Sequence, residues 1–155
     1  MTWNYIAGFF DGEGSLTHNG KGYRVTISQT NFEVLESIRM FSGVGYVIKP
    51  AKRKAHWKDN WVYYVARQKD VYSFMMKMKP FLVVKRDLFL SVEDKILNFV
   101  KRQKEKNILR QKKAELAVKL RNEGYTYREI GKRTNTDFGQ IRRVILKHGG
   151  CSSIG

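Results

Sequence analysis

One carboxylate near the start of the chain, Glu13, stands between two glycines and three residues after an apolar run at residues 6–10. Residues 3–12 predict a helix, and Gly12 and Gly14 are expected to end it, because glycine accepts the left-handed backbone of a helix exit. Glu13 would therefore lie at the end of this helix. A carboxylate in that place can bind a divalent cation, for which oxygen atoms are the preferred ligands.

The same helix has one side without bulky groups. Ala7 and Asp11 are four residues apart, as are Gly8 and Gly12, so each pair shares a side of the helix. Helices approach closely where side chains are small, and we expect all four residues to contact a second copy. Two Glu13 carboxylates would then meet across a twofold axis, where they repel unless a cation lies between them. We therefore predict a site for Mg²⁺ or Mn²⁺, bound by Glu13 and a backbone oxygen of Gly12.

Composition restricts the partner. The 155 residues include 30 Lys and Arg against 14 Asp and Glu, a formal net charge of +16, which favours a polyanion such as nucleic acid. No stretch approaches the roughly 18 apolar residues of a membrane span, and no signal-peptide pattern is present, so we expect an intracellular protein. The single cysteine, Cys151, argues against a disulfide framework, and His18, His56 and His148 lack metal-site spacing.

Alternating residues predict strands with one polar face. In residues 23–29 the apolar side chains occupy one face, while the other face is polar and cationic and suits a DNA groove. A second strand at residues 43–48 runs into a basic segment, and a third strand is expected at residues 61–68. The register of the third strand stays open: either Trp61, Tyr63 and Arg67, or Tyr64 and Gln68, would face the ligand. The residues of this sheet expected to bind DNA are Arg24, Thr26, Ser28, Tyr46, Lys49, Lys52, Arg53, Lys54, Tyr64 and Arg67.

Helical spacing predicts further helices at residues 32–41, 70–78 and about 85–103. The order of elements gives an α+β fold: one antiparallel sheet with helices on one face, over residues 1–100.

Residues 6–14, Ile-Ala-Gly-Phe-Phe-Asp-Gly-Glu-Gly, resemble the signature of the LAGLIDADG homing endonucleases, with Glu in place of the final Asp. The order of predicted elements is similar to the core of that family. Because the signature occurs once, the resemblance implies a homodimer that binds and cleaves double-stranded DNA.

The resemblance also implies catalytic roles for Glu13, Gln29 and Lys85. Gln29 would hold solvent near the metals, and Lys85 would lie near the scissile phosphate. One departure is that residues 30–33 carry no Arg or Lys, which the family often places shortly after the glutamine. The alternative is structural: Gln29 as the polar end of a strand and Lys85 as a solvated helix start.

The last third of the chain is strongly basic, with 15 Lys and Arg against 5 Asp and Glu in residues 101–155. Residues 101–113 are expected to be a basic linker or the exposed end of the long helix, and residues 149–155 a flexible tail. Capping patterns and an apolar spacing of eleven in residues 114–148 predict a helix-turn-helix. Its last helix would offer Gln140, Arg142 and Arg143 to a major groove. A small helical cap with solvated charges is the alternative.

Together these features predict a homodimeric, site-specific, Mg²⁺-dependent DNA endonuclease that cuts a long pseudo-palindromic site. Two alternatives remain open at this point: a non-catalytic DNA-binding transcription regulator, or an RNA-splicing maturase that acts on intron RNA.

Overall fold

A computed structural model describes residues 1–51, 56 and 58–148. The chain forms two compact units, Met1–Lys101 and Arg102–Gly155, which are described separately below. The predicted DNA contacts Lys52, Arg53 and Lys54 and the predicted tail at residues 149–155 lie outside the described residues.

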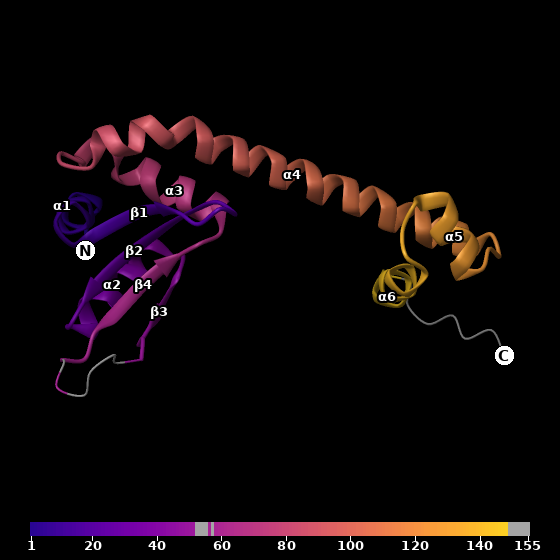
Figure 1. Ribbon diagram of the computed structural model, residues 1–155, viewed down its shortest axis with the longest axis horizontal. Coiled ribbons are helices and arrows are strands. Elements are labelled where there is room, and N and C mark those ends of the chain that lie inside the picture. Colours follow the sequence, from indigo (N-terminus) through magenta and orange to yellow (C-terminus); the bar gives the residue numbers. More distant parts are fainter. Residues whose placement is uncertain (52–55, 57, 149–155) are drawn as a thin grey trace. The chain divides into compact units, whose positions relative to one another are not determined.

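The first unit is built on one antiparallel sheet with the strand order β1-β2-β4-β3 (Figure 1). The helices pack on one face of this sheet, which confirms the α+β prediction. The elements are α1 (Trp3–Glu13), β1 (Gly14–His18), β2 (Tyr23–Gln29), α2 (Phe32–Ser42), β3 (Tyr46–Ile48), β4 (Trp61–Val65), α3 (Gln68–Met78), the short 3-10 helix η1 (Lys79–Phe81) and the start of α4 (Arg86–Asn122).

The core of the first unit lies between the sheet and the helices. Val25 and Ile27 of β2 are fully buried, while Arg24 and Thr26 are partly exposed and Ser28 is exposed, as the alternation predicts. Tyr63 of β4 is also fully buried, and this settles the register of the third strand. Tyr64 therefore faces the open side of the sheet, where it pairs with Thr26. Gln68 is not part of this strand, because it begins α3.

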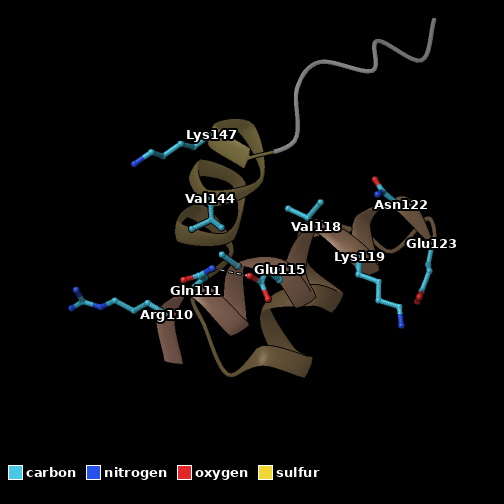
Figure 2. A pocket seen from close by; sticks show the side chains of 10 residues that line it. Arg110, Gln111, Glu115, Val118, Lys119, Asn122, Glu123, Val144 and Lys147 are labelled. Atoms are coloured by element: carbon cyan, nitrogen blue, oxygen red, sulfur yellow. Dashed lines mark hydrogen bonds between the residues drawn. The ribbon is translucent and has the colours of Figure 1, made fainter. Parts of the chain in front are cut away.

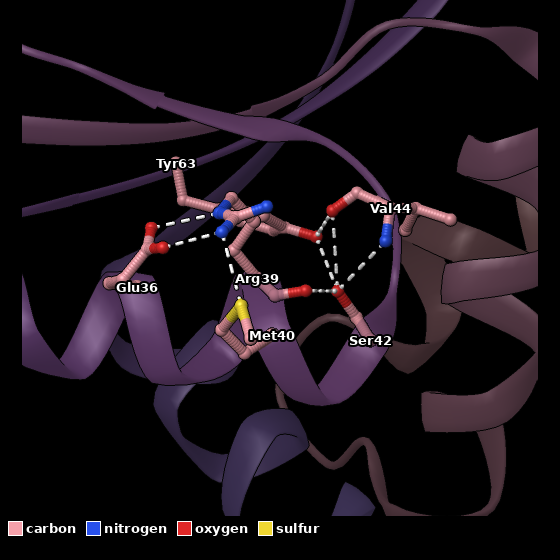
Figure 3. Close-up of polar contacts among 6 residues, drawn as sticks. All are labelled: Glu36, Arg39, Met40, Ser42, Val44 and Tyr63. Carbon is pink, nitrogen blue, oxygen red and sulfur yellow. Dashed lines mark hydrogen bonds and ion pairs between the residues drawn. The ribbon is translucent and has the colours of Figure 1, made fainter.

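A polar network joins the end of α2 to the sheet through the buried Tyr63 (Figure 3). Its hydroxyl donates to the Val44 carbonyl at 2.9 Å and lies 3.0 Å from the Ser42 hydroxyl. Burial raises the pKa of Tyr63 to about 12, so the phenol keeps its proton and remains a donor. Arg39 and Glu36, one turn apart on α2, form an ion pair beside this network. The predicted helix at residues 32–41 is thus fixed at its C-terminal end.

Helix α1 ends near the expected residue, but not through a left-handed glycine as the sequence predicted. Gly12 is inside the helix and Gly14 has φ −87°, so neither glycine uses a left-handed backbone. Gly14 is needed for space instead, because a Cβ there would lie 2.0 Å from the Phe10 ring. The chain then enters β1, a strand that the sequence did not predict, and Gly14 pairs with Ile27 of β2.

The second unit begins inside α4, which runs unbroken to Asn122. Residues 101–113 are therefore helical and not a linker, because they are rich in helix formers and contain neither Gly nor Pro. The helix ends where Gly124 takes a left-handed φ of 95° and Tyr125 donates to the Leu120 carbonyl.

Two short helices, α5 (Tyr127–Thr134) and α6 (Phe138–His148), complete the second unit. Thr126 and Glu129 form the predicted capping box at the start of α5. The turn to α6 passes through a left-handed Asn135, and the Asp137 carboxylate accepts the first amides of α6. A small apolar core joins these helices to the end of α4, formed by Ala117, Leu120, Ile130, Ile141 and Ile145. The helix-turn-helix geometry that the sequence predicts is present.

We expect Gly14→Ala to destabilise the first unit by about 1–3 kcal/mol, since the added methyl group would overlap the buried Phe10 ring. Gly12→Ala is the matched control, because a Cβ at Gly12 meets nothing within 4 Å. Urea unfolding followed by tryptophan fluorescence measures this unit alone, since all three tryptophans lie within residues 1–101. Equal unfolding midpoints for the two variants would contradict the packing role of Gly14.

Candidate active site and nucleic-acid interface

One carboxylate ties the C-terminal end of α1 to the segment before α4. Asp11 accepts three backbone N–H groups: those of Val83 at 2.7 Å, Val84 at 3.2 Å and Lys85 at 2.9 Å. Hydrogen bonds to an ionised acceptor are stronger than neutral ones, and three of them fix the backbone of this segment. We call this arrangement the Asp11 clamp.

The side chain of Lys85 adds a second connection between α1 and the segment before α4. Its ammonium group donates to the backbone carbonyls of Phe10, at 3.1 Å, and of Asp11. These carbonyls belong to the last turn of α1, where a cation interacts favourably with the helix dipole. Lys85, which the family resemblance places near a scissile phosphate, thus lies at the end of α1. There its ammonium group binds the carbonyl of Asp11, two residues before Glu13.

The charge of Asp11 is set by the clamp. Partial burial acts to raise the pKa of Asp11, but the amides of Val83, Lys85 and Val84 outweigh it together with the Lys85 charge. The pKa of Asp11 is therefore held below its usual value, and the carboxylate stays ionised at neutral pH.

Glu13 is exposed at the last position of α1, and β1 begins at the next residue. Because Gly14 pairs with Ile27, the end of β2 that carries Gln29 lies at the same end of the sheet as Glu13. The Gln29 side-chain oxygen accepts from the amide and the hydroxyl of Thr30, at 2.8 and 3.2 Å. The three predicted catalytic residues are thus brought to one end of the sheet by three different segments.

The predicted dimer face divides into two parts. Ala7 is fully buried in the core of its own chain and has no surface to offer a partner. The side chain of Asp11 is engaged by the clamp. Gly8 and Gly12 are exposed, and nothing within 4 Å would meet a Cβ at either position. Only the two glycines of the predicted set therefore form a free small-residue stripe.

The open face of the sheet carries the predicted polar residues in an ordered arrangement. Arg24 donates to the Thr17 hydroxyl at 3.0 Å and to the Tyr64 hydroxyl at 3.4 Å. The rings of Tyr64 and Tyr46 lie 5.3 Å apart, and these residues pair across β3 and β4. Thr26 sits opposite Tyr64 in β2. The cation of Arg24 is therefore held over the sheet by neighbours on both sides.

The remaining predicted contacts of the first unit lie at its edges. Ser28 is exposed near the end of β2. Lys49 forms an ion pair with Asp59 at 2.7 Å and lies over the Trp61 ring. The Arg67 side chain is largely exposed and is 3.7 Å from Asp70.

Ser15 and Thr17 of β1 face the same open side of the sheet, since they pair with Thr26 and Arg24. Sequence reasoning missed both residues because it did not predict β1.

On α6 the predicted residues Gln140, Arg142 and Arg143 are all exposed, whereas Ile141 and Ile145 are buried in the small core. The Arg143 guanidinium donates to the Gly139 carbonyl one turn back. These three residues form a polar and cationic patch on the exposed side of α6, which also carries the exposed apolar residues Phe138 and Leu146. Side chains of this polar kind can contact base edges or phosphates in a DNA groove.

A cavity of about 950 Å³ lies between α6 and the last part of α4, and all its lining residues belong to the second unit (Figure 2). Its wall combines carboxylates, cationic groups, amides and aliphatic side chains. Glu13 is exposed and does not line this cavity.

Within the described residues, no cluster of three or more His, Cys, Asp or Glu side chains could hold a metal ion. At the end of α1 the Asp11 carboxylate is engaged by the clamp, and Glu13 is the exposed carboxylate. None of the helices in the described part of the chain has the length and hydropathy of a membrane span.

A family model described as "LAGLIDADG-like domain" matches residues 3–79, which confirms the resemblance seen in the signature. Among solved structures, the chain is similar to the archaeal intron-encoded homing endonuclease I-Vdi141I complexed with DNA, at 23% identity and a TM-score of 0.51, over 94% of each chain. It is also similar to the homing endonuclease I-CvuI in complex with its target, at 18% identity and a TM-score of 0.50, over 96% of this chain and 95% of that one. These two likenesses show the fold. No curated protein matches the chain.

The Asp11 clamp predicts an acid-dependent loss of stability. A carboxylate whose pKa is lowered by folding contributes stability above its unfolded pKa, and this contribution is lost as pH falls through the folded pKa. We expect Asp11→Asn to cost about 1 kcal/mol at pH 7 after allowing for solvent screening, because the new amide would face N–H donors.

The difference between the wild-type protein and Asp11→Asn should shrink below about pH 4, where an unfolded aspartate begins to protonate. Urea unfolding of the first unit, followed by tryptophan fluorescence at pH values from 7 to 3, measures this difference in stability. Asp94→Asn, on an exposed part of α4, is the control and should match the wild-type profile. A pH-independent gap between wild type and Asp11→Asn would argue against an ionised clamp.

Proposed function

Because residues 3–79 of this chain belong to the LAGLIDADG-like domain family, we propose that the protein is a homodimeric, site-specific endonuclease of double-stranded DNA. The observation that carries this proposal is the exposed Glu13 at the end of α1, beside Lys85 and at the same end of the sheet as Gln29.

The donor set of one chain is too small for a metal, but that of two chains is not. A carboxylate and a backbone carbonyl from residues 12–13 of each copy would give at least four oxygens, which fits Mg²⁺ or Mn²⁺. The cation would supply Lewis acid chemistry for phosphodiester hydrolysis. The fit therefore depends on a second copy.

The residues of the chain would perform the remaining work. The Gln29 amide would orient solvent for attack on the phosphate. Lys85 would keep a positive charge at the end of α1 and, through the Asp11 clamp, hold Glu13 in place. The free Gly8 and Gly12 stripe would let the two α1 helices approach until both carboxylates meet.

DNA would lie against the open face of the sheet. Arg24 is the cation best prepared for this role, because Thr17 and Tyr64 hold it in one arrangement. An arginine fixed in advance loses less conformational freedom when it binds a base or a phosphate. The homing endonucleases with similar folds were solved with DNA, which supports this placement.

The second unit would lengthen the recognised site without taking part in the chemistry. Residues 101–155 carry a net charge of +10, from 15 basic and 5 acidic residues. Helix α6 presents an exposed cationic side next to a left-handed turn, the arrangement by which a helix-turn-helix enters a major groove.

We expect Glu13→Gln to abolish cleavage while leaving DNA affinity within a few fold of the wild type. The substitution keeps the size of the side chain but removes the negative charge that a cation needs. Cleavage of a selected duplex in Mg²⁺ and binding in Ca²⁺ measure the two effects separately. Glu33→Gln, in the first turn of α2, is the matched control and should cut normally.

Normal cutting by Glu13→Gln would overturn the assignment of this residue. A wild-type protein that binds one duplex sequence tightly but never cuts it would instead identify a DNA-binding regulator.

We expect Arg142→Ala with Arg143→Ala to weaken DNA binding and shorten the protected footprint. For every phosphate that the variant no longer neutralises, the slope of log affinity against log salt should fall by about 0.9. The matched control is Lys112→Ala with Lys113→Ala, which removes the same charge from α4. Footprinting and a salt titration distinguish the pairs, and equal effects of both would mean that α6 has no specific role.

A further inference from the structure

We propose that a second copy of this chain covers Val83 and Val84, which form part of the dimer interface together with the glycine stripe of α1. We call these two residues the valine patch. The inference rests on the homodimer of the proposed function and goes beyond it, since α1 alone was expected to form the interface. The observation behind it is the exposure of these side chains, 82% for Val83 and 74% for Val84.

Those values are the highest for any large apolar side chain in the described part of the chain. The valines are not on a loose loop, because both of their amides donate to Asp11. An apolar pair that the fold holds in water is unfavourable for the isolated chain, and burial against a partner removes that cost.

Helix geometry places the valine patch beside the glycine stripe. Successive residues of α1 turn by about 100°, so Gly8 and Gly12 lie about 60° and 100° around the helix from Asp11. Tyr5 and Phe9 follow at about 120° and 160° in the same direction. The stripe is therefore bordered by the Asp11 clamp on one side and by two aromatic residues on the other.

The area that a stable dimer requires supports the same conclusion. Helix α1 has 11 residues and is about 16 Å long. Its free stripe consists of glycines, which contribute no side-chain surface. A stable interface buries about 800 Å² on each partner, more than two crossed helices of this length supply. Apolar surface next to the stripe is needed, and the valine patch is the most exposed apolar surface there.

The twofold symmetry of the dimer then indicates which surface of the second copy contacts the valine patch. Both Glu13 carboxylates must lie at one end of the dimer, so the two α1 helices run parallel with the twofold axis along them. A half turn about this axis brings the valine side of one copy against the aromatic side of the other. There the rings of Tyr5 and Phe9 stack at 5.9 Å, with Tyr5 48% exposed. The valine patch would therefore pack against this stack.

The test is the dimer dissociation constant of the full chain without DNA, measured by sedimentation velocity over a dilution series. We expect Val83→Glu with Val84→Glu to weaken the dimer by at least about 30-fold, as truncation of a central apolar group in an interface does. Leu109→Glu with Leu116→Glu adds the same charge at exposed apolar positions of α4 and should leave the constant unchanged. Tryptophan fluorescence and circular dichroism report whether each variant is folded.

If the glutamate pair fails to fold, Val83→Ser with Val84→Ser is the second variant, and it should weaken the dimer in the same direction. An unchanged constant for a folded valine variant, an equal loss in the control, or a wild-type chain that is monomeric even on DNA would overturn the inference. A dimer that depends on the valines but never cuts DNA would support the interface and overturn only the endonuclease proposal.

Discussion

The Asp11 clamp is the interaction on which the rest of the candidate site depends. A single carboxylate accepts three consecutive amides and thereby joins two segments more than 70 residues apart in the sequence. The clamp brings Lys85 to the C-terminal end of α1, where its ammonium group binds carbonyls of residues that shortly precede Glu13. It also fixes the backbone of the two exposed residues Val83 and Val84. The segment is also anchored by the buried Leu82, but only the clamp fixes the backbone amides of both valines and of Lys85.

The strands of the sheet have two roles, because one face packs against the core and the other is the proposed DNA-binding face. Alternation allows this: Val25 and Ile27 point into the core, while Arg24 stands on the other face with Thr17 and Tyr64. A long cationic side chain on a bare sheet would sample many rotamers. Here the neighbouring hydroxyls restrict it, so that the cost of ordering the guanidinium is met during folding and not during binding.

Local sequence patterns were enough to predict the features that depend on neighbours in the chain, such as the alternation in β2 and the capping box at Thr126. They failed where distant contacts decide. Strand β1 has one buried apolar residue, Leu16, and owes its existence to pairing with β2. The hydrogen bonds of Asp11 could not be predicted from its neighbours, because its three partners lie more than 70 residues along the chain. The register of the third predicted strand became clear only from the burial of Tyr63, whose hydroxyl donates to the Val44 carbonyl in the segment after α2.

The four residues from Asp11 to Gly14 show why so short a segment can carry so much of the candidate site. Each meets a different physical demand: Asp11 binds the segment that precedes α4, Gly12 leaves room, Glu13 is exposed at the helix end, and Gly14 avoids the Phe10 ring. Successive helical residues point about 100° apart, so adjacent residues reach different surroundings. The identical glycines are therefore not equivalent, since one is open to a partner and the other is required by the core. Substitutions of neighbouring residues in this segment should fail in different ways, through a lost interface, a lost charge or a lost fold.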